Sequence, residues 1–535
     1  MIGPFQWVLR NARLHAADRD RRSAAGFVRH IPGEPHRSQV RRWESGGVAL
    51  THGLVRRYET ALELSEGQLL RAIDLIARED APLMALPAVP PPTSPDVVRE
   101  AMPLLERALG HEPMNGLHWD RLTTLMALTP HVLVRSRDWA SLVHRLCVET
   151  AVSTGLEYAH RWEAAARIVG NPHVTDVVIE LIEGALTDDD EQLYSDYANL
   201  LRFCADPRGH DILAHVITAP ANRRAQWASF STATTLVRHG LLSHENAAII
   251  LPVALEVLVD EQLPTRTRKA AASLAFRTDG RALRSTSSHT VKRLRLRAQE
   301  RRTVNRMLSW TTHEHEHQDA IYAATIDELV RDQRADAHDA GLATLVHTAL
   351  REPHLDVRDT ALAVLLLSPQ GRTLGRVLAQ DLDSALHAAD LGRAGSDLSM
   401  LSWLSQPEDL LLLADLATGR RRGDPELAAH AGAAVGNTSQ PAGLARDALD
   451  ADLAGYAAGQ ISRRRTDPSA PAGNAWGVAY ALGMRGRFDL VADLLHLTSQ
   501  RRDPEWHSSL TWWASIPDVV RPRPPARAGE RPSRG

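Results

Sequence analysis

The sequence has few of the residues that mark secreted, membrane-bound or metal-binding proteins. Only two of its 535 residues are cysteine, Cys147 and Cys204, too few for a disulfide framework or a thiolate zinc site. Neither has a Cys-x-x-Cys spacing, so we expect two buried thiols in a reducing compartment. No stretch approaches the ~20 uncharged apolar residues of a membrane span, and the first residues lack the apolar core of a secretory signal. These absences predict a soluble, cytoplasmic protein that does not contact a membrane.

Motifs of enzyme chemistry are missing as well. The chain has no Gly-rich phosphate loop ending in Lys-Ser/Thr, no His-Glu-x-x-His and no Gly-x-Ser-x-Gly. His313 and His317 would share one helix face, but zinc needs a third or fourth protein ligand. We favour a polar first helical turn for residues 312–318, and metal binding by His313, His315 or His317 stays open. We therefore predict no enzymatic activity, no metal site and no cofactor.

Charge is divided unevenly along the chain. Residues 1–60 hold eleven arginines and five acidic residues, a net charge of +6, and the remaining residues hold 51 basic and 60 acidic ones. A basic end on an acidic chain is expected where that end meets a polyanion. A second basic stretch, residues 290–307, could extend contact to nucleic acid, although we favour a solvated helix face there.

Hydrophobic spacing predicts helices along almost the whole chain and thus an all-α fold. Five short helices fit within residues 1–80. Residues 81–97 are rich in proline, which cannot continue a helix, and predict a linker. Helices joined by short turns then follow over residues 98–516. The tail, residues 517–535, has almost no apolar residues and is predicted to be disordered.

The long helical region predicts repeated hairpins. Helix pairs joined by short Pro, Gly or Asn turns cannot bury one face alone, so stacking them gives a long α-solenoid of helical hairpins. Residues 352–369 resemble a HEAT repeat, with Asp356, Val357, Arg358 and Ala361 at that family's Asp, Val-Arg and Ala positions. Residues 486–495, GRFDLVADLL, look instead like the inner turn of a tetratricopeptide repeat. We favour an irregular HEAT-like array, with tetratricopeptide repeats as the alternative.

The segment HRSQVRRWESGG, residues 36–47, is the clearest functional motif. It resembles the recognition helix of the lambda-repressor/Cro-like (XRE family) helix-turn-helix proteins, which often end this helix with Arg-Trp-Glu-x-Gly. The matching positions are the cap His36, the groove-facing Arg37, Ser38 and Gln39, the inward Val40, the outward Arg41, and the closing Arg42, Trp43, Glu44 and Gly46. The resemblance covers about 80 residues and implies a bacterial-type transcription regulator that binds double-stranded DNA.

The residues themselves also favour DNA as the partner. One side of a short helix with Arg37, Ser38, Gln39 and Arg41 fits a major groove, where arginine pairs with guanine and glutamine with adenine. The predicted DNA-binding set is completed by Arg42, Ser23 and Arg22. Phosphates could be held by further arginines at nearby helix ends: Arg10, Arg13, Arg22, Arg56 and Arg57. We expect Trp43 in the core and Glu44 as the partner of an N-terminal arginine such as Arg13.

Two features depart from the family pattern. Ser23-Ala24-Ala25 replaces the glutamine that usually opens the second helix, so that glutamine's contact with DNA is missing. The turn HIPGEPH, residues 30–36, is longer than the usual Gly-centred turn, which affects the docking angle of the predicted recognition helix.

Two functions follow from these patterns. The first is a sequence-specific DNA-binding regulator whose helical-repeat body senses an effector or binds a protein. Such a regulator could act as a homodimer. The alternative is a cytoplasmic α-solenoid scaffold for a protein or signalling peptide, with a helix-turn-helix module that does not bind DNA.

Overall fold

The computed structural model describes residues 4–81, 83, 94–110, 112–128, 134–278, 315–332, 339–352, 354–421, 424–438, 444–467, 469–471, 473–501 and 503–522. All regular elements in these ranges are helices, and no strand occurs among them. The predicted all-α class is therefore confirmed. Among the described helices, none combines the length and the apolar character that crossing a membrane would require.

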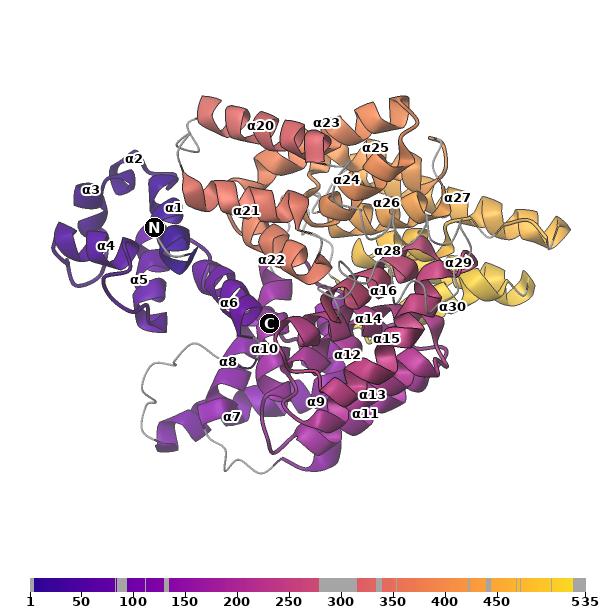
Figure 1. Ribbon diagram of the computed structural model, residues 1–535, viewed down its shortest axis with the longest axis horizontal. Coiled ribbons are helices and arrows are strands. Elements are labelled where there is room, and N and C mark those ends of the chain that lie inside the picture. Colours follow the sequence, from indigo (N-terminus) through magenta and orange to yellow (C-terminus); the bar gives the residue numbers. More distant parts are fainter. Residues whose placement is uncertain are drawn as a thin grey trace. The chain divides into compact units, whose positions relative to one another are not determined.

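The chain forms two compact units (Figure 1). Unit 1 comprises Met1–Ala151, Leu156–Ala320 and Ala340–Val364, and unit 2 comprises Val152–Gly155, Ile321–Asp339 and Leu365–Gly535. This division does not fall at the proline-rich stretch. The helix before that stretch ends at Asp80 and the helix after it begins at Ser94, three residues before the end of the predicted linker.

The first six helices of unit 1 form the segment that we call the head, residues 4–80. They are α1 (Pro4–Leu14), α2 (Arg19–Arg22), α3 (Ala24–Val28), α4 (Arg37–Glu44), α5 (His52–Leu62) and α6 (Gln68–Asp80). Five helices were predicted, and the additional one is the four-residue α2, which precedes the Ser23 cap of the predicted second helix. The Ser23 Oγ accepts a hydrogen bond from the Gly26 backbone N at 2.9 Å and so caps α3, a position where serine is preferred.

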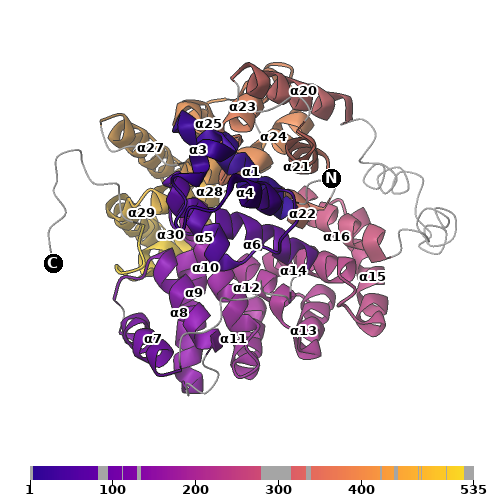
Figure 2. The same ribbon diagram turned by 90° about the vertical axis from the view of Figure 1, so that its left-hand side faces the viewer.

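Unit 1 continues with paired helices joined by short turns. They are α7 (Ser94–Leu109), α8 (Gly116–Leu128), α9 (Ser136–Ala151), α10 (Gly155–Val169), α11 (Thr175–Thr187), α12 (Tyr194–Leu200), the 3-10 helix η1 (Leu201–Phe203), α13 (Pro207–Thr218), α14 (Arg223–Arg238), α15 (His244–Val259) and α16 (Thr265–Thr278). Figure 2 shows α11, α13 and α15 following one another in one row and α12, α14 and α16 in a second row. We call α7–α16 the array.

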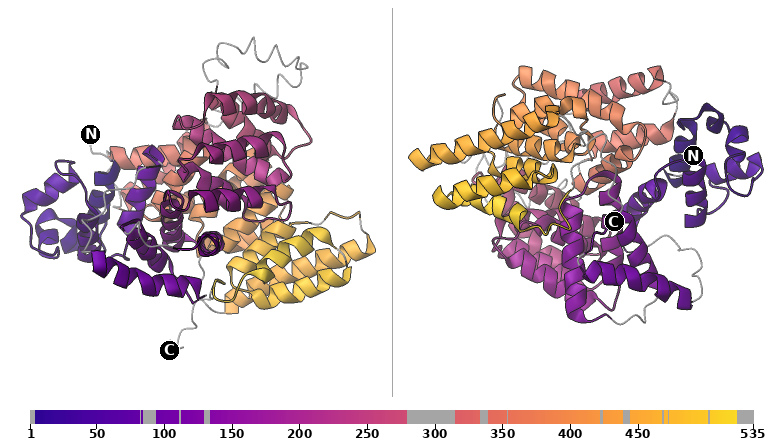
Figure 3. Two further views of the ribbon diagram at one scale, coloured as in Figure 1. Left: turned by 90° about the horizontal axis from the view of Figure 1, so that it is seen from below. Right: turned by 180° about the vertical axis from the view of Figure 1, so that it is seen from behind.

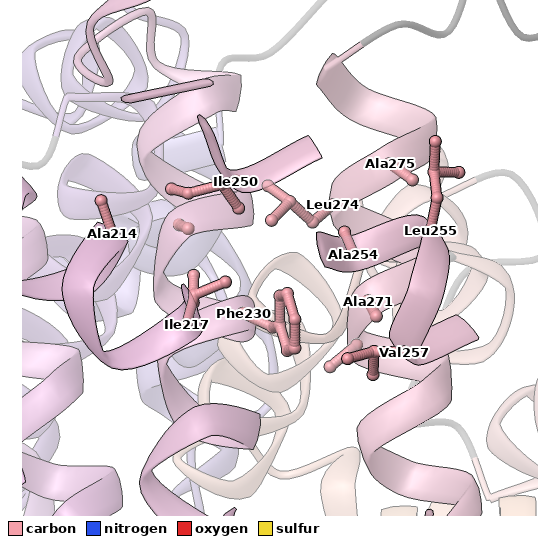
Figure 4. Packing of buried hydrophobic residues seen from close by; sticks show 12 residues of the cluster. Ala214, Ile217, Phe230, Ile250, Ala254, Leu255, Val257, Ala271, Leu274 and Ala275 are labelled. Carbon is pink, nitrogen blue, oxygen red and sulfur yellow. The ribbon is translucent and has the colours of Figure 1, made fainter. Parts of the chain in front are cut away.

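The array is held together by small and branched apolar side chains between the two rows. Phe230 of α14 is fully buried and lies between Ile217 of α13 and Ala271 of α16 (Figure 4). Alanine at positions such as Ala254 and Ala271 lets the helices approach closely at normal packing density. Cys147 and Cys204 are buried free thiols, as predicted, and burial raises the pKa of both.

Unit 2 repeats the same two-row arrangement. Its helices are α23 (Gly371–His387), α24 (Leu391–Leu404), the 3-10 helix η2 (Pro407–Asp409), α25 (Leu410–Ala417), α26 (Pro425–Asn437), α27 (Leu444–Thr466), α28 (Ala475–Met484), α29 (Phe488–Arg501) and α30 (Pro504–Ser515). Successive contacts link α24, α26, α28 and α30 in one row, and the last helices, coloured yellow, lie side by side in Figure 3. Two of them begin with an aspartate cap and a proline, Asp424-Pro425 and Asp503-Pro504, a favoured helix start.

Three further helices lie between these groups in the sequence: α20 (His315–Arg331), α21 (Ala340–Arg351) and α22 (Leu355–Leu366). Short segments that contain Pro, Gly or Asn separate successive helices at residues 170–174, 219–222 and 260–264. The basic residues 290–307 and His313 lie outside the described residues.

The start of the predicted disordered tail packs on unit 2. Val520 is buried, and the Arg521 guanidinium lies 4.5 Å from the centroid of the Phe488 ring. The predicted disorder therefore does not extend to residues 517–522, and residues 523–535 lie outside the described residues.

Gly432 gives a test of the close packing in unit 2. A Cβ at Gly432 of α26 would lie 2.5 Å from the Gly477 backbone oxygen of α28, so Gly432→Ala should lower the free energy of unfolding by roughly 1–3 kcal/mol. Gly455→Ala is the control, because a Cβ there meets nothing within 4 Å and alanine should stabilise α27 by roughly 0.5–1 kcal/mol. Calorimetry of both variants checks this, and equal shifts would contradict the packing.

Candidate nucleic-acid interface

The helix α4 presents one buried and one exposed side. Val40, Trp43 and Glu44 are buried, as predicted for Val40 and Trp43. The other predicted positions of this helix are all exposed: Arg37, Ser38, Gln39, Arg41 and Arg42. Because Arg37 and Arg41 are four residues apart, their side chains lie on the same face. The exposed side of α4 is therefore strongly cationic.

Two of the residues predicted to contact DNA, Ser38 and Gln39, also interact with the cap residue of α4. The Gln39 Oε1 accepts a hydrogen bond from the His36 backbone N at 2.9 Å, and the Ser38 Oγ lies 2.8 Å from the His36 Nδ1. His36 is the N-cap, as predicted, and with Gln39 it forms a capping box. The Gln39 side chain thus satisfies a backbone group at the start of α4, and the Ser38 hydroxyl contacts the capping imidazole, two roles that the sequence did not indicate.

The end of α4 requires glycine. The Gly46 φ angle is +83°, and the Gly47 backbone N donates to the Arg42 oxygen at 2.9 Å. This is the hydrogen bond of a Schellman ending, in which the residue after the cap adopts a left-handed conformation that favours glycine. The two glycines stop the helix, as predicted from the sequence.

A buried ion pair connects α4 to α1. The Arg13 Nε and Nη2 donate to the two Glu44 carboxylate oxygens at 2.6 and 2.7 Å, and both side chains are only 7% exposed. Burial acts to lower the pKa of Arg13, but the hydrogen bonds and the charge of Glu44 outweigh it and raise that pKa. The predicted pairing of Glu44 with Arg13 is confirmed. The suggestion that Arg13 holds a phosphate is wrong, because its guanidinium is buried and already bound.

Aromatic rings complete the core behind α4. The Tyr58 hydroxyl donates to the Glu44 Oε1 at 3.2 Å, and burial, followed by the charge of Glu44, raises the pKa of Tyr58. The Tyr58 ring lies 4.8 Å from the Phe27 ring and 6.1 Å from the Trp43 ring, between centroids. The side chains of α1, α3 and α5 therefore fix the position of α4.

The remaining predicted DNA contacts are already engaged in part. Ser23 caps α3, and the Arg22 Nε donates to the Ala16 backbone oxygen at 2.9 Å. The Arg57 Nη2 donates to the Pro32 oxygen at 2.5 Å, and its guanidinium lies 5.6 Å from the Trp43 ring centroid. Arg57 thus stabilises the long turn before α4. Arg10 is exposed on α1.

Arginines of the head differ in whether they have acidic partners. Several lie in ion pairs, namely the partly buried Arg21 with Glu63 at 2.5 Å and the exposed Arg29 and Arg56 with Asp20 at 2.5 Å and Glu66 at 3.3 Å. Within the described ranges, no carboxylate forms an ion pair with Arg37, Arg41 or Arg42. Because like charges four residues apart on a helix cost roughly 0.2–0.5 kcal/mol, an anion bound on this face would relieve that repulsion.

The head is joined to the array through α6. The Arg71 Nη1 donates to the Asp120 Oδ1 of α8 at 2.9 Å, and the Arg78 Nη2 donates to the Glu163 Oε1 of α10 at 2.8 Å. All four side chains are at most 10% exposed. Breaking such a pair leaves a buried charge without a partner, which costs much free energy. The helix α6 is therefore firmly attached to α8 and α10.

Hydrophobic spacing alone did not identify these residues. A usable signal exists, since Arg71, Asp74 and Arg78 share one side of α6 and all three are buried. Charged residues at the spacing of a buried face indicate buried ion pairs. Their partners on α8 and α10 could not be found, because one sequence does not specify which distant helices meet.

The start of α6 depends on a residue from α5. The buried Glu59 carboxylate accepts hydrogen bonds from the backbone N atoms of Gly67, Leu69 and Leu70 at 2.9, 2.8 and 3.0 Å. These are backbone groups that a helix start leaves unsatisfied. Burial raises the pKa of Glu59, although the three hydrogen bonds act against that rise.

No family model matches the chain, and no curated protein matches it in sequence. The assignment of this interface therefore depends on the geometry of its residues alone.

Replacing Glu44 by glutamine tests the buried pair. Glu44→Gln leaves the Arg13 charge buried without its carboxylate, so we expect the head to lose roughly 3–5 kcal/mol of stability. Hydrogen exchange of the α1 and α4 amides in the full chain measures this loss. Glu63→Gln removes an exposed partner of Arg21 and should change stability by less than about 1 kcal/mol. Similar effects of the two changes would contradict the role assigned to Glu44.

Proposed function

We propose that this protein is a sequence-specific DNA-binding transcription regulator. In this proposal α2, α3 and α4 act as a helix-turn-helix of the XRE type, and α4 is the recognition helix. The observation that supports it best is the exposed cationic face of α4, where Arg37, Arg41 and Arg42 have no acidic partner among the described residues. The confirmed Arg13–Glu44 pair adds support, because it holds this face outward.

Affinity and sequence preference would come from different residues of that face. Arg41, Arg42 and Arg10 suit phosphates, whose binding releases counterions and weakens as salt rises. Arg37 lies in the first turn of α4 and suits a guanine edge in the major groove. Gln39 already accepts a hydrogen bond from the His36 backbone N, and Ser38 contacts the His36 imidazole, so we assign them mainly to the position of the helix and only secondarily to base contacts.

The helical-repeat body would regulate the head. We propose an α-solenoid of HEAT-like hairpins, with tetratricopeptide repeats as the alternative, whose surface takes an effector or partner protein. If two copies bind together, their half-sites would lie one turn of DNA apart, ~34 Å.

Titration of the full chain with duplex DNA tests this function. We expect affinity to fall steeply between 50 and 200 mM salt, as counterion release requires. Arg42→Ala should weaken binding to all sequences and reduce the slope of log K against log salt by about 1, whereas Arg37→Ala should cost about 1–3 kcal/mol at one base position. Selection from random duplexes measures the preference.

The control is Arg29→Ala, which removes an exposed arginine already paired with Asp20 and should leave the salt slope unchanged. Absence of binding at 50 mM salt would refute the DNA proposal. Binding without any sequence preference would refute the recognition role of α4 while keeping a nucleic-acid contact.

A second candidate function is a peptide-binding scaffold, and a group of aromatic residues in unit 2 favours it. Trp476 of α28 is 37% exposed and stacks on Tyr480, with ring centroids 5.3 Å apart. The Tyr480 hydroxyl donates to the Asn437 Oδ1 of α26 at 2.8 Å. Aromatic rings beside amide and hydroxyl groups suit an extended, proline-bearing peptide.

Fluorescence polarisation of the full chain with a pool of proline-rich peptides tests the scaffold function. Peptides selected by the native chain should bind Trp476→Ala at least about tenfold more weakly, because stacking area is lost. Leu411→Ala, which truncates a side chain that is 76% exposed on α25, should bind as the native chain does. Equal affinities for Trp476→Ala and the native chain would refute this role.

A further inference from the structure

Two helices from the middle of the chain contact the head directly. A Cβ at Gly341 of α21 would lie 2.3 Å from the Trp7 Cδ1 of α1, so the buried indole packs against the backbone of α21. One helix later, the Thr360 Oγ1 of α22 donates to the Glu79 Oε2 of α6 at 3.1 Å. Consecutive helices thus contact both the first and the last helix of the head.

A group of four charged residues, which we call the Arg238 cluster, lies at the second contact: Glu79, Arg202, Arg238 and Asp356. The Arg238 Nη2 lies 2.5 Å from the Glu79 Oε1 and 2.9 Å from the Asp356 Oδ2. The Arg202 Nη2 lies 3.8 and 3.9 Å from the same two carboxylates. Arg238 of α14 therefore joins α6 of the head to α22.

These contacts determine how firmly α4 is held. The helix α1 bears Arg13, which binds Glu44 of α4, and α6 packs against α1 and α5. Moving α21 and α22 away would release Trp7 on one side of the head and Glu79 on the other. No hydrogen bond or ion pair of the described residues joins α4 to the Arg238 cluster, so an effect of the cluster on α4 would pass through α1 and α6.

We propose that α21 and α22 form a regulatory segment that holds the head in place, and that the Arg238 cluster is the contact through which the array controls α4. This inference rests on the proposed function in one respect, namely that the position of α4 matters for DNA. The mechanical coupling itself is independent of DNA. An effector that displaces α22 from Arg238 would then loosen α1, α4 and α6 together.

The cluster also gives this contact a dependence on pH. Burial, then the charge of Asp356, raises the pKa of Glu79 to about 7, against the opposing charges of Arg238 and Arg202. Burial acts to raise the pKa of Asp356 too, but the two arginines lower it.

Other titratable groups face the same residues from α14, α16 and α22. Burial, followed by nearby arginines, lowers the pKa of His239 and of His354 to about 4, and burial lowers the pKa of Arg277. Glu79 is thus the group of this region that titrates near neutral pH. Because its pKa is higher in the folded protein than the ordinary value of 4.5, its proton stabilises the contact at low pH, and this stabilisation is lost as the pH rises from about 4.5 to about 7.

Hydrogen exchange of the full chain by mass spectrometry tests the coupling. Asp356→Asn removes the charge that α22 places beside Arg238 and Arg202, and Thr360→Val removes the hydrogen bond from α22 to Glu79. Both changes nearly keep the side-chain volume, and we expect the amides of α1, α4 and α6 to exchange at least about fivefold faster in each variant. The matched control is Arg208→Gln on α13, whose exposed guanidinium binds Asp176 and Asp206, and it should leave those helices unchanged. Faster exchange confined to α14 and α22 would overturn the proposal.

The pH arm uses Glu79→Gln, a neutral substitute for the protonated carboxyl. In the native chain, α6 should open about tenfold less often at pH 6 than at pH 8, after correction for the intrinsic exchange rate. In Glu79→Gln this difference should vanish. An unchanged pH dependence in the variant would overturn the role of Glu79.

DNA binding is measured on the same variants as a separate readout. Faster exchange in α1, α4 and α6 together with altered DNA affinity supports both the coupling and the proposed function. Faster exchange in a chain that binds no DNA supports the coupling and refutes the function. DNA binding without any change in exchange refutes the coupling alone.

Discussion

Arginine side chains removed from water and paired with carboxylates connect the N-terminal helices of this chain to one another and to the array. Arg13 binds Glu44 inside the head, Arg71 binds Asp120, and Arg78 binds Glu163. The cost of desolvating both charges cancels much of the attraction in such a pair. Their main effect is therefore on geometry, since only one relative position of the two helices leaves no buried charge alone.

This constraint explains why the proline-rich stretch does not separate two independent parts. The helix α6 belongs to the head through its contacts with α1 and α5, and it belongs equally to the array through Arg71 and Arg78. The helix ends at Asp80, before the proline-rich stretch, and both arginines that attach it to the array lie within the helix. The helix α4, held in this way, has its orientation set by the array rather than by a flexible linker.

Much of the local structure could be predicted from sequence, because it depends on neighbours along the chain. The Ser23 and His36 caps, the glycine ending at Gly46 and the inward side of α4 all follow from short patterns. The Arg13–Glu44 pair was also predicted, although its partners lie 31 residues apart, because the resemblance indicated a structural role for Glu44. The short helix α2 was missed, since its four residues, Arg19–Arg22, include no apolar side chain and so give no hydrophobic spacing.

Contacts between distant segments could not be predicted, and they decide how the candidate interface is held. Nothing in the pattern around Asp356 shows that it meets Arg238, and its match to a HEAT repeat suggested only a position within a hairpin. In the structure the same aspartate lies beside Glu79, so two carboxylates share the positive charge of Arg238 and Arg202. Two acids so close together cannot both be fully charged without a nearby cation. The position of α22 against α6 therefore depends on those arginines. Because α6 packs against α1 and α1 is paired with α4, the position of α4 depends on the same arginines.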